Sequence, residues 1–199
     1  MPRKDKRAQI LDAAEKLFKN KRYHEMTLDL VAKEAKVGKG TIYLYFKDKD
    51  DLVFQLALRG HDELCELIRN YTKLEDISFD ELLEKVCNEI SRFFLGRHAL
   101  FRATGEHEMR LSAFREKRRE EFNVHRRKLQ SAIEEILAKG PVRKDIELSV
   151  QANFFLGMMR TRDHMFGGNE TDMPPIKMLA DIFMNGFGKN SNMVFPDKK

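Results

Sequence analysis

Residues 39–45, KGTIYLY, combine a cation, hydroxyl groups and apolar side chains at helical spacing. Ile42 and Phe46 are four residues apart, so both face one side of a helix. The residues left on the other sides are Lys39, Gly40, Thr41, Tyr43 and Leu44. Hydroxyl and ammonium groups bond phosphates and base edges, and a leucine can meet a thymine methyl. This face therefore suits a nucleic-acid groove better than bulk water.

A second apolar stripe lies just before this run. Leu28, Val31, Ala32 and Ala35 follow the i, i+3, i+4, i+7 pattern of a helix, and Thr27 precedes them as an N-cap. Two short helices joined by a tight turn form a helix-turn-helix, whose second helix enters the major groove. A plain hairpin within a helical bundle has the same periodicity, so the pattern alone leaves both interpretations open.

The segment from residue 3 to about residue 20 carries a third apolar stripe, which includes Ile10, Leu11 and Phe18. This stripe predicts a helix that packs across the other two, which makes a three-helix head. Residues 1–60 contain 14 Lys plus Arg against 9 Asp plus Glu, whereas residues 61–199 contain 23 of each. All the excess positive charge of the chain therefore lies in the first 60 residues, as in a phosphate-binding head on a neutral body.

Beyond the head, every periodic segment is helical. Asp48 and Asp51 resemble a capping box at the start of a fourth helix of roughly 24 residues, which would be ~36 Å long and bridge two domains. Ser78 and Glu81 predict a second capped helix, and Gly140-Pro141 ends a long charged helix. We therefore predict an all-α fold of about nine helices, with a three-helix N-terminal domain and a larger helical bundle.

The last two helices differ from the others in their apolar surface. The segment SVQANFFLGMM is apolar nearly all the way round, and Pro174-Pro175 starts a final helix with an apolar stripe. A helix that is apolar on two faces needs two partners. The second partner is either the chain itself or the same helix pair of another subunit.

The run Ile10 to Leu56, and most closely VGKGTIYLYFKDKDDL, resembles the DNA-binding domain of the TetR family of bacterial transcriptional regulators. The resemblance implies that the following positions approach DNA: Thr27, Lys39, Gly40, Thr41, Tyr43, Leu44, Tyr45 and Lys49. Arg22 and Lys36 stand where the family usually has glycine. Each would hold a left-handed turn conformation at a cost of roughly 1 kcal/mol.

The resemblance also implies the organisation and the partners. Residues 1–48 would form the helix-turn-helix domain, and residues 49–199 an effector-binding and dimerisation domain. The protein would be a homodimeric repressor that binds a palindromic double-stranded DNA operator and is released by a small lipophilic effector. In this family the last two helices build the dimer interface, and the residues expected there are Phe154, Gly157, Met158, Leu179, Phe183 and Phe187.

The body is rich in phenylalanine and methionine, with 15 and 10 in the whole chain. Such residues either fill the core or line an apolar pocket, and the family places its small-molecule site among the middle helices. The candidates for pocket lining are Phe93, Phe94, Phe101, Met109, Phe114, Phe122, Phe154, Phe155 and Met158.

Other functions remain open on the sequence alone. His61 and Cys65 are four residues apart, a spacing that two metal ligands can use, so a metal-responsive regulator is one alternative. A helical enzyme or carrier of lipophilic molecules with an incidental basic end is another, and an architectural DNA-binding protein is a third. We identify no catalytic motif and assign no catalytic residue, metal ligand or cofactor.

The expected location is the cytoplasm. The start of the chain, MPRKDKRAQILDAAEK, reads as an amphipathic helix with acidic residues and does not resemble a signal peptide. No apolar run approaches the 18 or so residues of a membrane span, so we expect no membrane partner.

Overall fold

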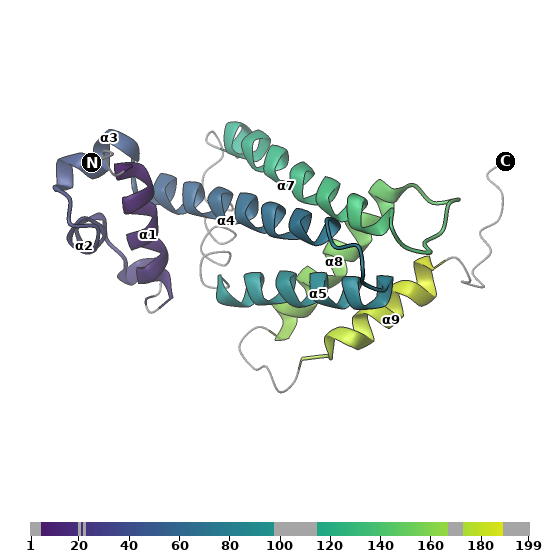
Figure 1. The fold of residues 1–199 in the computed structure, drawn as a ribbon. Coiled ribbons are helices and arrows are strands. Elements are labelled where there is room, and N and C mark those ends of the chain that lie inside the picture. The colour runs from purple at the N-terminus through teal and green to yellow at the C-terminus, as the bar shows by residue number, and fades with distance from the viewer. Residues whose placement is uncertain (1–4, 20, 22, 98–114, 167–172, 189–199) are drawn as a thin grey trace. The chain divides into compact units, whose positions relative to one another are not determined.

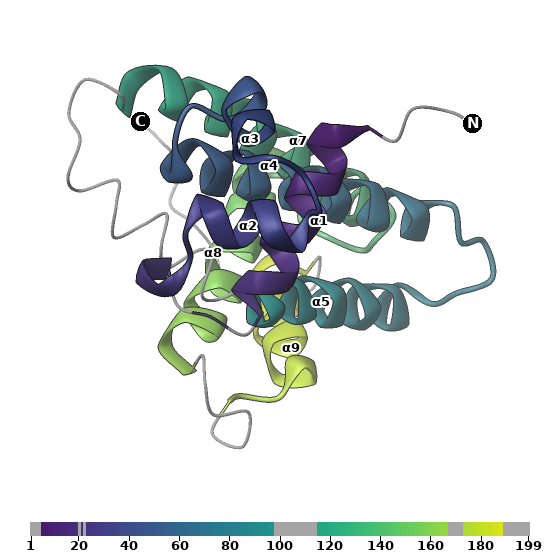
Figure 2. The same cartoon turned by 90° about the vertical axis from the view of Figure 1, so that its left-hand side faces the viewer.

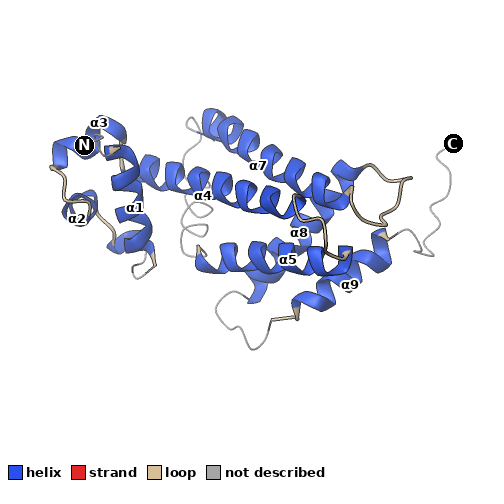
Figure 3. Cartoon of the chain, viewed as in Figure 1, coloured by secondary structure: helices blue, strands red, loops and turns tan. Residues whose placement is uncertain are grey.

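The computed structural model describes residues 5–19, 21, 23–97, 115–166 and 173–188. Within these ranges the regular structure consists of eight α-helices and one short 3-10 helix, and loops join them (Figure 3). An isolated β-bridge joins Val142 and Gly188. The predicted all-α class with an N-terminal helix-turn-helix is confirmed.

The chain divides into two compact units. The first consists of Met1–Asp62 and Gly96–His125, and the second of Glu63–Leu95 and Arg126–Lys199. Two long helices, α4 (Lys49–Thr72) and α7 (Arg115–Leu137), contribute residues to both units. The predicted length of the fourth helix, 24 residues, is the observed one.

The first unit begins with a helical head. Its elements are α1 (Lys6–Phe18), the 3-10 helix η1 (Tyr23–Glu25), α2 (Leu28–Glu34), α3 (Lys39–Tyr45) and the start of α4. Helix α2 packs against both α1 and α3 (Figures 1 and 2). Side-chain caps fix two of these helix starts. Asp5 accepts a hydrogen bond from the N–H of Arg7 at 3.0 Å, and the Thr27 hydroxyl accepts one from the N–H of Leu30 at 3.2 Å.

The turn between α2 and α3 depends on a left-handed residue. Lys36 has a φ of 52°, which is the conformation expected from its place in the sequence. Around it, the N–H of Val37 bonds the carbonyl of Ala32 at 3.0 Å, and the N–H of Lys36 bonds that of Lys33 at 3.2 Å. These are the two bonds of a Schellman motif, in which glycine usually occupies the position of Lys36. The other predicted position, Arg22, lies outside the described residues.

The capping box of α4 is also present. An oxygen of Asp48 accepts a hydrogen bond from the N–H of Asp51 at 2.7 Å, and the Asp51 carboxylate accepts one from the N–H of Lys47 at 2.9 Å. Directly before this start, Phe46 is 1% exposed and belongs to the core of the head, together with Ile10, Val31, Ile42, Leu52 and Leu56. The apolar faces of four helices therefore meet in one cluster, which fixes the orientation of α3.

The second unit contains α5 (Phe79–Gly96), α8 (Leu148–Phe166) and α9 (Ile176–Phe187). The Ser78 hydroxyl caps α5 by accepting from the N–H of Glu81 at 3.3 Å. Gly140 is needed for close packing, because a Cβ there would lie 2.2 Å from ring atoms of Phe79. Helices α8 and α9 pack together through an edge-to-face contact of Phe155 with Phe183, whose ring centroids are 5.2 Å apart.

Candidate nucleic-acid interface

Helix α3 presents the face that its sequence predicts. Ile42 is fully buried, whereas the exposed fractions of Leu44, Tyr43 and Tyr45 are 82%, 52% and 43%. Gly40 is also exposed, and a Cβ built on it would meet nothing within 4 Å. Hydroxyl and apolar groups therefore stand together on a rigid helix, and its backbone is open to close approach at Gly40.

Lys39, the first residue of α3, forms an ion pair with Asp29 of α2. Its ammonium lies 2.8 Å from one carboxylate oxygen of Asp29 and 3.0 Å from the other. Both side chains are largely exposed. The hydrogen bond and the charge of Asp29 raise the pKa of Lys39, so this lysine stays charged at neutral pH. The sequence predicted the position of Lys39 but not its partner.

Two other predicted DNA contacts have structural partners in the head. Thr27 is exposed and caps α2. The Lys49 ammonium lies 4.0 Å from the ring centroid of Tyr23 and donates to the Tyr23 carbonyl at 3.2 Å. Burial lowers the pKa of Lys49. The Tyr23 hydroxyl donates to Asp50, so the start of α4 is tied to the turn before α2.

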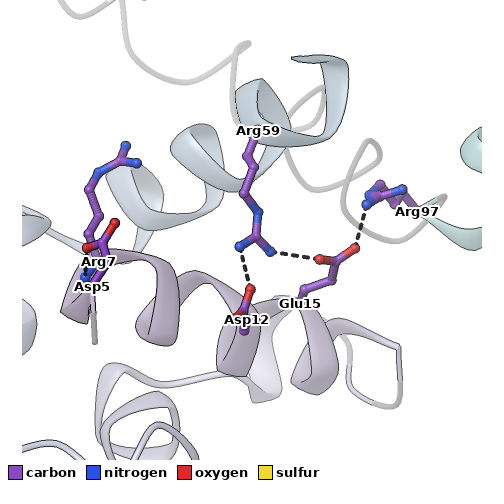
Figure 4. A network of polar contacts seen from close by, with 6 residues as sticks. All are labelled: Asp5, Arg7, Asp12, Glu15, Arg59 and Arg97. Carbon is purple, nitrogen blue, oxygen red and sulfur yellow. Dashed lines mark hydrogen bonds and ion pairs between the residues drawn. The ribbon is translucent and has the colours of Figure 1, made fainter. Parts of the chain in front are cut away.

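A network of charged residues in the first unit joins α1 to α4 and to Arg97, which directly follows α5 (Figure 4). The Arg59 guanidinium donates to Asp12 at 2.6 Å and to Glu15 at 2.7 Å. Arg97 pairs with the other oxygen of Glu15 at 2.6 Å. About a fifth of each of the Glu15, Arg59 and Arg97 side chains is exposed. Sequence reasoning missed this network, since its members are up to 82 positions apart and no local pattern links them.

Arg7 of α1 illustrates how the head uses its positive charge. Its guanidinium donates to Gln55 at 2.6 Å and lies 5.7 Å from the ring centroid of Phe46. This arginine therefore covers the core residue Phe46 and links α1 to α4.

The predicted pocket residues are distributed over both units. Phe93 and Phe94 of α5 form an edge-to-face pair with centroids 5.4 Å apart, and Phe155 is fully buried. Met158 is half-buried and Phe154 is 62% exposed. Phe122 belongs to the first unit, where its ring lies edge-on to His61 at 5.0 Å. Phe101, Met109 and Phe114 lie outside the described residues.

The residues expected at a dimer interface fall into two groups. Leu179 and Phe183 are 4% and 2% exposed, so the chain itself buries them. Gly157, Met158 and Phe187 are partly exposed, and Phe154 is largely exposed. Among the side chains of α8 and α9 that the structure describes, the large apolar ones left exposed are Val150, Phe154, Met178 and Ile182. Sequence reasoning missed three of these four, although the spacings 150/154 and 178/182 each mark one face of a helix.

His61 on α4 is buried beside the ring of Phe122. It is 5% exposed, and burial lowers its pKa to about 4, with a further contribution from the neighbouring His125. His125 itself bonds the Asp62 carboxylate at 2.9 Å. Among the residues that the structure describes, no group of three or more His, Cys, Asp or Glu side chains is arranged to hold a metal ion. The side chains of three other histidines that could complete such a site, His98, His107 and His164, lie outside the described part of the chain.

Comparison with known proteins relates the head to one family. Residues 10–56 match the family model described as bacterial regulatory proteins, tetR family. The HTH-type transcriptional regulator YhgD of Bacillus subtilis is 54% identical over 48 residues, which are 24% of this chain and 25% of that protein. The fatty acid metabolism regulator protein of B. subtilis is 27% identical over 157 residues, or 78% of this chain and 80% of the relative.

The whole chain shares its fold with solved structures. The fatty acid degradation regulator FadR from Bacillus halodurans superposes with a TM-score of 0.68 at 21% identity, over 94% of this chain and 96% of that one. FadR from B. subtilis, crystallised in complex with stearoyl-CoA, gives a TM-score of 0.66 at 23% identity, over 90% and 96%. No helix in the described ranges is long and apolar enough to cross a membrane.

Proposed function

We propose that this chain, which belongs to the TetR family of bacterial transcriptional regulators, is a homodimeric repressor controlled by a fatty-acyl-CoA. Residues 1–48 form the DNA-binding domain, and residues 49–199 bind the effector and form the dimer. The site of action is the cytoplasm, where the operator DNA is.

The observation that carries the DNA-binding part is the outward face of α3. Leu44, Tyr43 and Tyr45 are exposed on a helix whose opposite side is fully buried, and water is a poor partner for such a face. In the major groove, Leu44 contacts a thymine methyl, and the Tyr43 and Thr41 hydroxyls bond phosphate or base edges. The backbone at Gly40 approaches the DNA closely.

The remaining predicted contacts act at the edges of this face. Lys39 reaches the groove beside Tyr43. Thr27 caps α2, and Lys49 holds the start of α4 in place. The Thr27 hydroxyl and the Lys49 ammonium also contact the phosphate backbone. Phosphate contacts of this kind set the register of the protein on DNA without reading sequence.

The dimer interface is the exposed apolar surface of α8 and α9. Val150, Phe154, Met178 and Ile182 are each at least 40% exposed in the single chain. Contiguous apolar side chains on a surface typically mark an interaction site, and a two-fold axis lets the same patch serve both subunits. Such a dimer places two α3 helices about 34–36 Å apart on successive major grooves of a palindromic operator.

The effector assignment rests on the relatives. One relative, matched over 80% of its length, is a fatty acid metabolism regulator, and a structural neighbour was crystallised with stearoyl-CoA. The phenylalanine-rich second unit offers apolar side chains for an acyl chain, in particular Phe93, Phe94 and Met158. Because α4 contributes residues to both units, a shift of this helix when the acyl chain binds can be transmitted to the head. The acyl-CoA then lowers operator affinity, and the operator lowers acyl-CoA affinity by the same factor.

Selection from a pool of random duplexes at roughly physiological salt tests the DNA-binding part. We expect a palindromic consensus with half-sites about one helical turn apart. Retention of duplexes with no consensus would instead indicate a protein that binds DNA without reading its sequence.

Titration of the selected operator complex tests the effector. We expect stearoyl-CoA to release the DNA at concentrations at which coenzyme A alone and stearate alone leave it bound. Operator affinity that is unchanged at saturating stearoyl-CoA would exclude acyl-CoA control, and the DNA-binding proposal would stand.

A further inference from the structure

Asp29 introduces a negative charge at the surface that meets DNA in the proposed function. It is the second residue of α2 and is exposed, and its carboxylate contacts the ammonium of Lys39 at 2.8 and 3.0 Å. Lys39 is the first residue of α3, and Gly40, Thr41 and Tyr43 follow it on the same helix. The ion pair therefore lies at the edge of the exposed face of α3.

The stability of the head does not explain this pair. Both side chains are more than half exposed, and an ion pair in such a setting contributes little to folding because water and salt screen it. In a surface that only attracts phosphates, Asp29 would be unfavourable, since it cancels the charge of Lys39 and repels the DNA backbone. A carboxylate is useful at such a place when it accepts a hydrogen bond from a base.

We propose that Asp29 and Lys39 act together as a specificity element that reads one base pair, preferentially G·C, in each operator half-site; this rests on the proposed function. The geometry supports it. The ammonium and the carboxylate oxygens are 2.8–3.0 Å apart. The O6 of guanine and the N4 of its paired cytosine are joined by a hydrogen bond and lie at a similar separation. Lys39 can donate to O6 while Asp29 accepts from the N4 amino group.

The same arrangement discriminates against the other base pairs. A C·G or an A·T pair in that place presents its amino group to the ammonium and its oxygen to the carboxylate, so both contacts become repulsive. A T·A pair keeps the right order, with O4 facing Lys39, but it places the thymine methyl where guanine offers N7 as a second acceptor. The expected preference on that strand is therefore guanine first, thymine second, and adenine or cytosine last.

Two variants distinguish base reading by Asp29 from a general change in the electrostatic attraction between the head and DNA. Asp29→Asn keeps the size of the side chain and removes its charge. Glu34→Gln is the matched control, because it makes the same charge change at another ion pair of the head, that of Glu34 with Lys16. Asp29 is exposed and Glu34 is partly exposed, and neither belongs to the core of the head, so neither substitution disturbs that core; circular dichroism of the full-length variants checks this.

The experiment is the random-duplex selection, carried out in parallel with the wild type, Asp29→Asn and Glu34→Gln. We expect a guanine at one position of each half-site for the wild type and for Glu34→Gln. With Asp29→Asn, the preference for guanine over adenine at that position alone should fall by about tenfold or more, the worth of one good base contact.

The outcomes distinguish this inference from the function on which it rests. A consensus that is the same for Asp29→Asn and the wild type at every position would overturn the base-reading role and leave the repressor proposal intact. A wild type that yields no consensus at all would overturn the repressor proposal, and the inference with it. A matching loss with Glu34→Gln would assign the effect to charge and refute the role of Asp29.

Discussion

The head and the second unit are built from the same kind of element but differ in what they leave exposed. The head encloses its apolar residues in one cluster and exposes large apolar groups chiefly on α3, at Tyr43, Leu44 and Tyr45. The second unit exposes apolar side chains without hydroxyl groups, mainly on α8 and α9, as Phe154 and Met178, and also at Leu67 and Leu74. Aromatic and hydroxyl groups on a narrow helix suit a groove, whereas a purely apolar patch suits a second copy of the protein.

The two regions also differ in similarity to known proteins. About 50 residues of the head match relatives at 50% or 54% identity, whereas the long match to the fatty acid metabolism regulator is 27% identical. A DNA-reading surface is tied to a short run of residues with fixed spacing. A ligand site in a helical bundle depends on packing over the whole domain, so its sequence is less constrained.

The largest expected effect is the loss of the head core. Phe46→Ala removes a ring that is 1% exposed, and we expect a loss of about 3–5 kcal/mol in the stability of the head. Chemical denaturation followed by tyrosine fluorescence measures it, because three of the four tyrosines, at 23, 43 and 45, lie in the head. Leu44→Ala is the control, with a change of at most about 0.5 kcal/mol. Equal destabilisation by both variants would contradict the assigned orientation of α3.

The next effect is a dependence of stability on pH in the first unit. His61 is neutral in the folded state, with a pKa lowered to about 4 by burial, against about 6.5 in the unfolded chain. The stability that results from this pKa difference is therefore fully present above pH 6.5. It is lost as the pH falls towards 4, and the free energy of unfolding decreases by up to about 3 kcal/mol. Between pH 7.5 and 4.5 the free energy of unfolding of the wild type should fall by up to about 3 kcal/mol more than that of His61→Gln, which has no titratable group at this position. Parallel pH profiles would show that His61 does not titrate in this range.

A somewhat smaller effect is expected at the apolar surface of α8 and α9. Phe154→Asp places a charge where we propose a subunit contact, and we expect the dimer dissociation constant to rise by about 30-fold or more, as for an interface hot spot. Sedimentation velocity across a range of concentrations measures it. Val124→Asp changes another exposed apolar residue, on α7, and should leave the dimer intact. An unchanged dimer in Phe154→Asp would move the interface elsewhere.

The smallest effect concerns the charged network of the first unit. Glu15→Gln removes the carboxylate that Arg59 and Arg97 share, and since all three are partly exposed we expect a loss of only about 1 kcal/mol. A double-mutant cycle of Glu15→Gln and Arg59→Met isolates the interaction between Glu15 and Arg59. The double variant should lose less stability than the sum of the two single variants. Additive losses would show that Arg59 and Glu15 do not stabilise each other.

Features set by neighbouring residues could be predicted from the sequence. The caps at Thr27 and Asp48 follow from residue types within one helical turn, and the length of α4 follows from its continuous apolar stripe. The left-handed Lys36 is expected from the resemblance to the TetR family, which has glycine at this position. The orientation of α3 follows as well, because Ile42 and Phe46 have only one apolar core to enter.

Features that depend on distant residues could not be predicted. The ion pair of Lys39 with Asp29 depends on the angle of the turn between two helices, and the network around Glu15 on how α1 meets α4. The stripe on α9 predicted burial of Leu179 and Phe183, but periodicity does not distinguish burial within a chain from burial between chains. The spacing of Met178 and Ile182 places both on one helix face, but only the packing of α8 on α9 shows that this face is exposed.

Sequence reading by the exposed face of α3 can be measured as a difference in affinity between two duplexes. Its most direct test is the ratio of dissociation constants for a scrambled duplex and for the selected operator, at one salt concentration, for the wild type and for Leu44→Ala. We expect a ratio of about 10³ or more for the wild type and a fall of at least about fivefold in the variant, with the fold intact. A wild-type ratio near one, or the same ratio in both proteins, would contradict it.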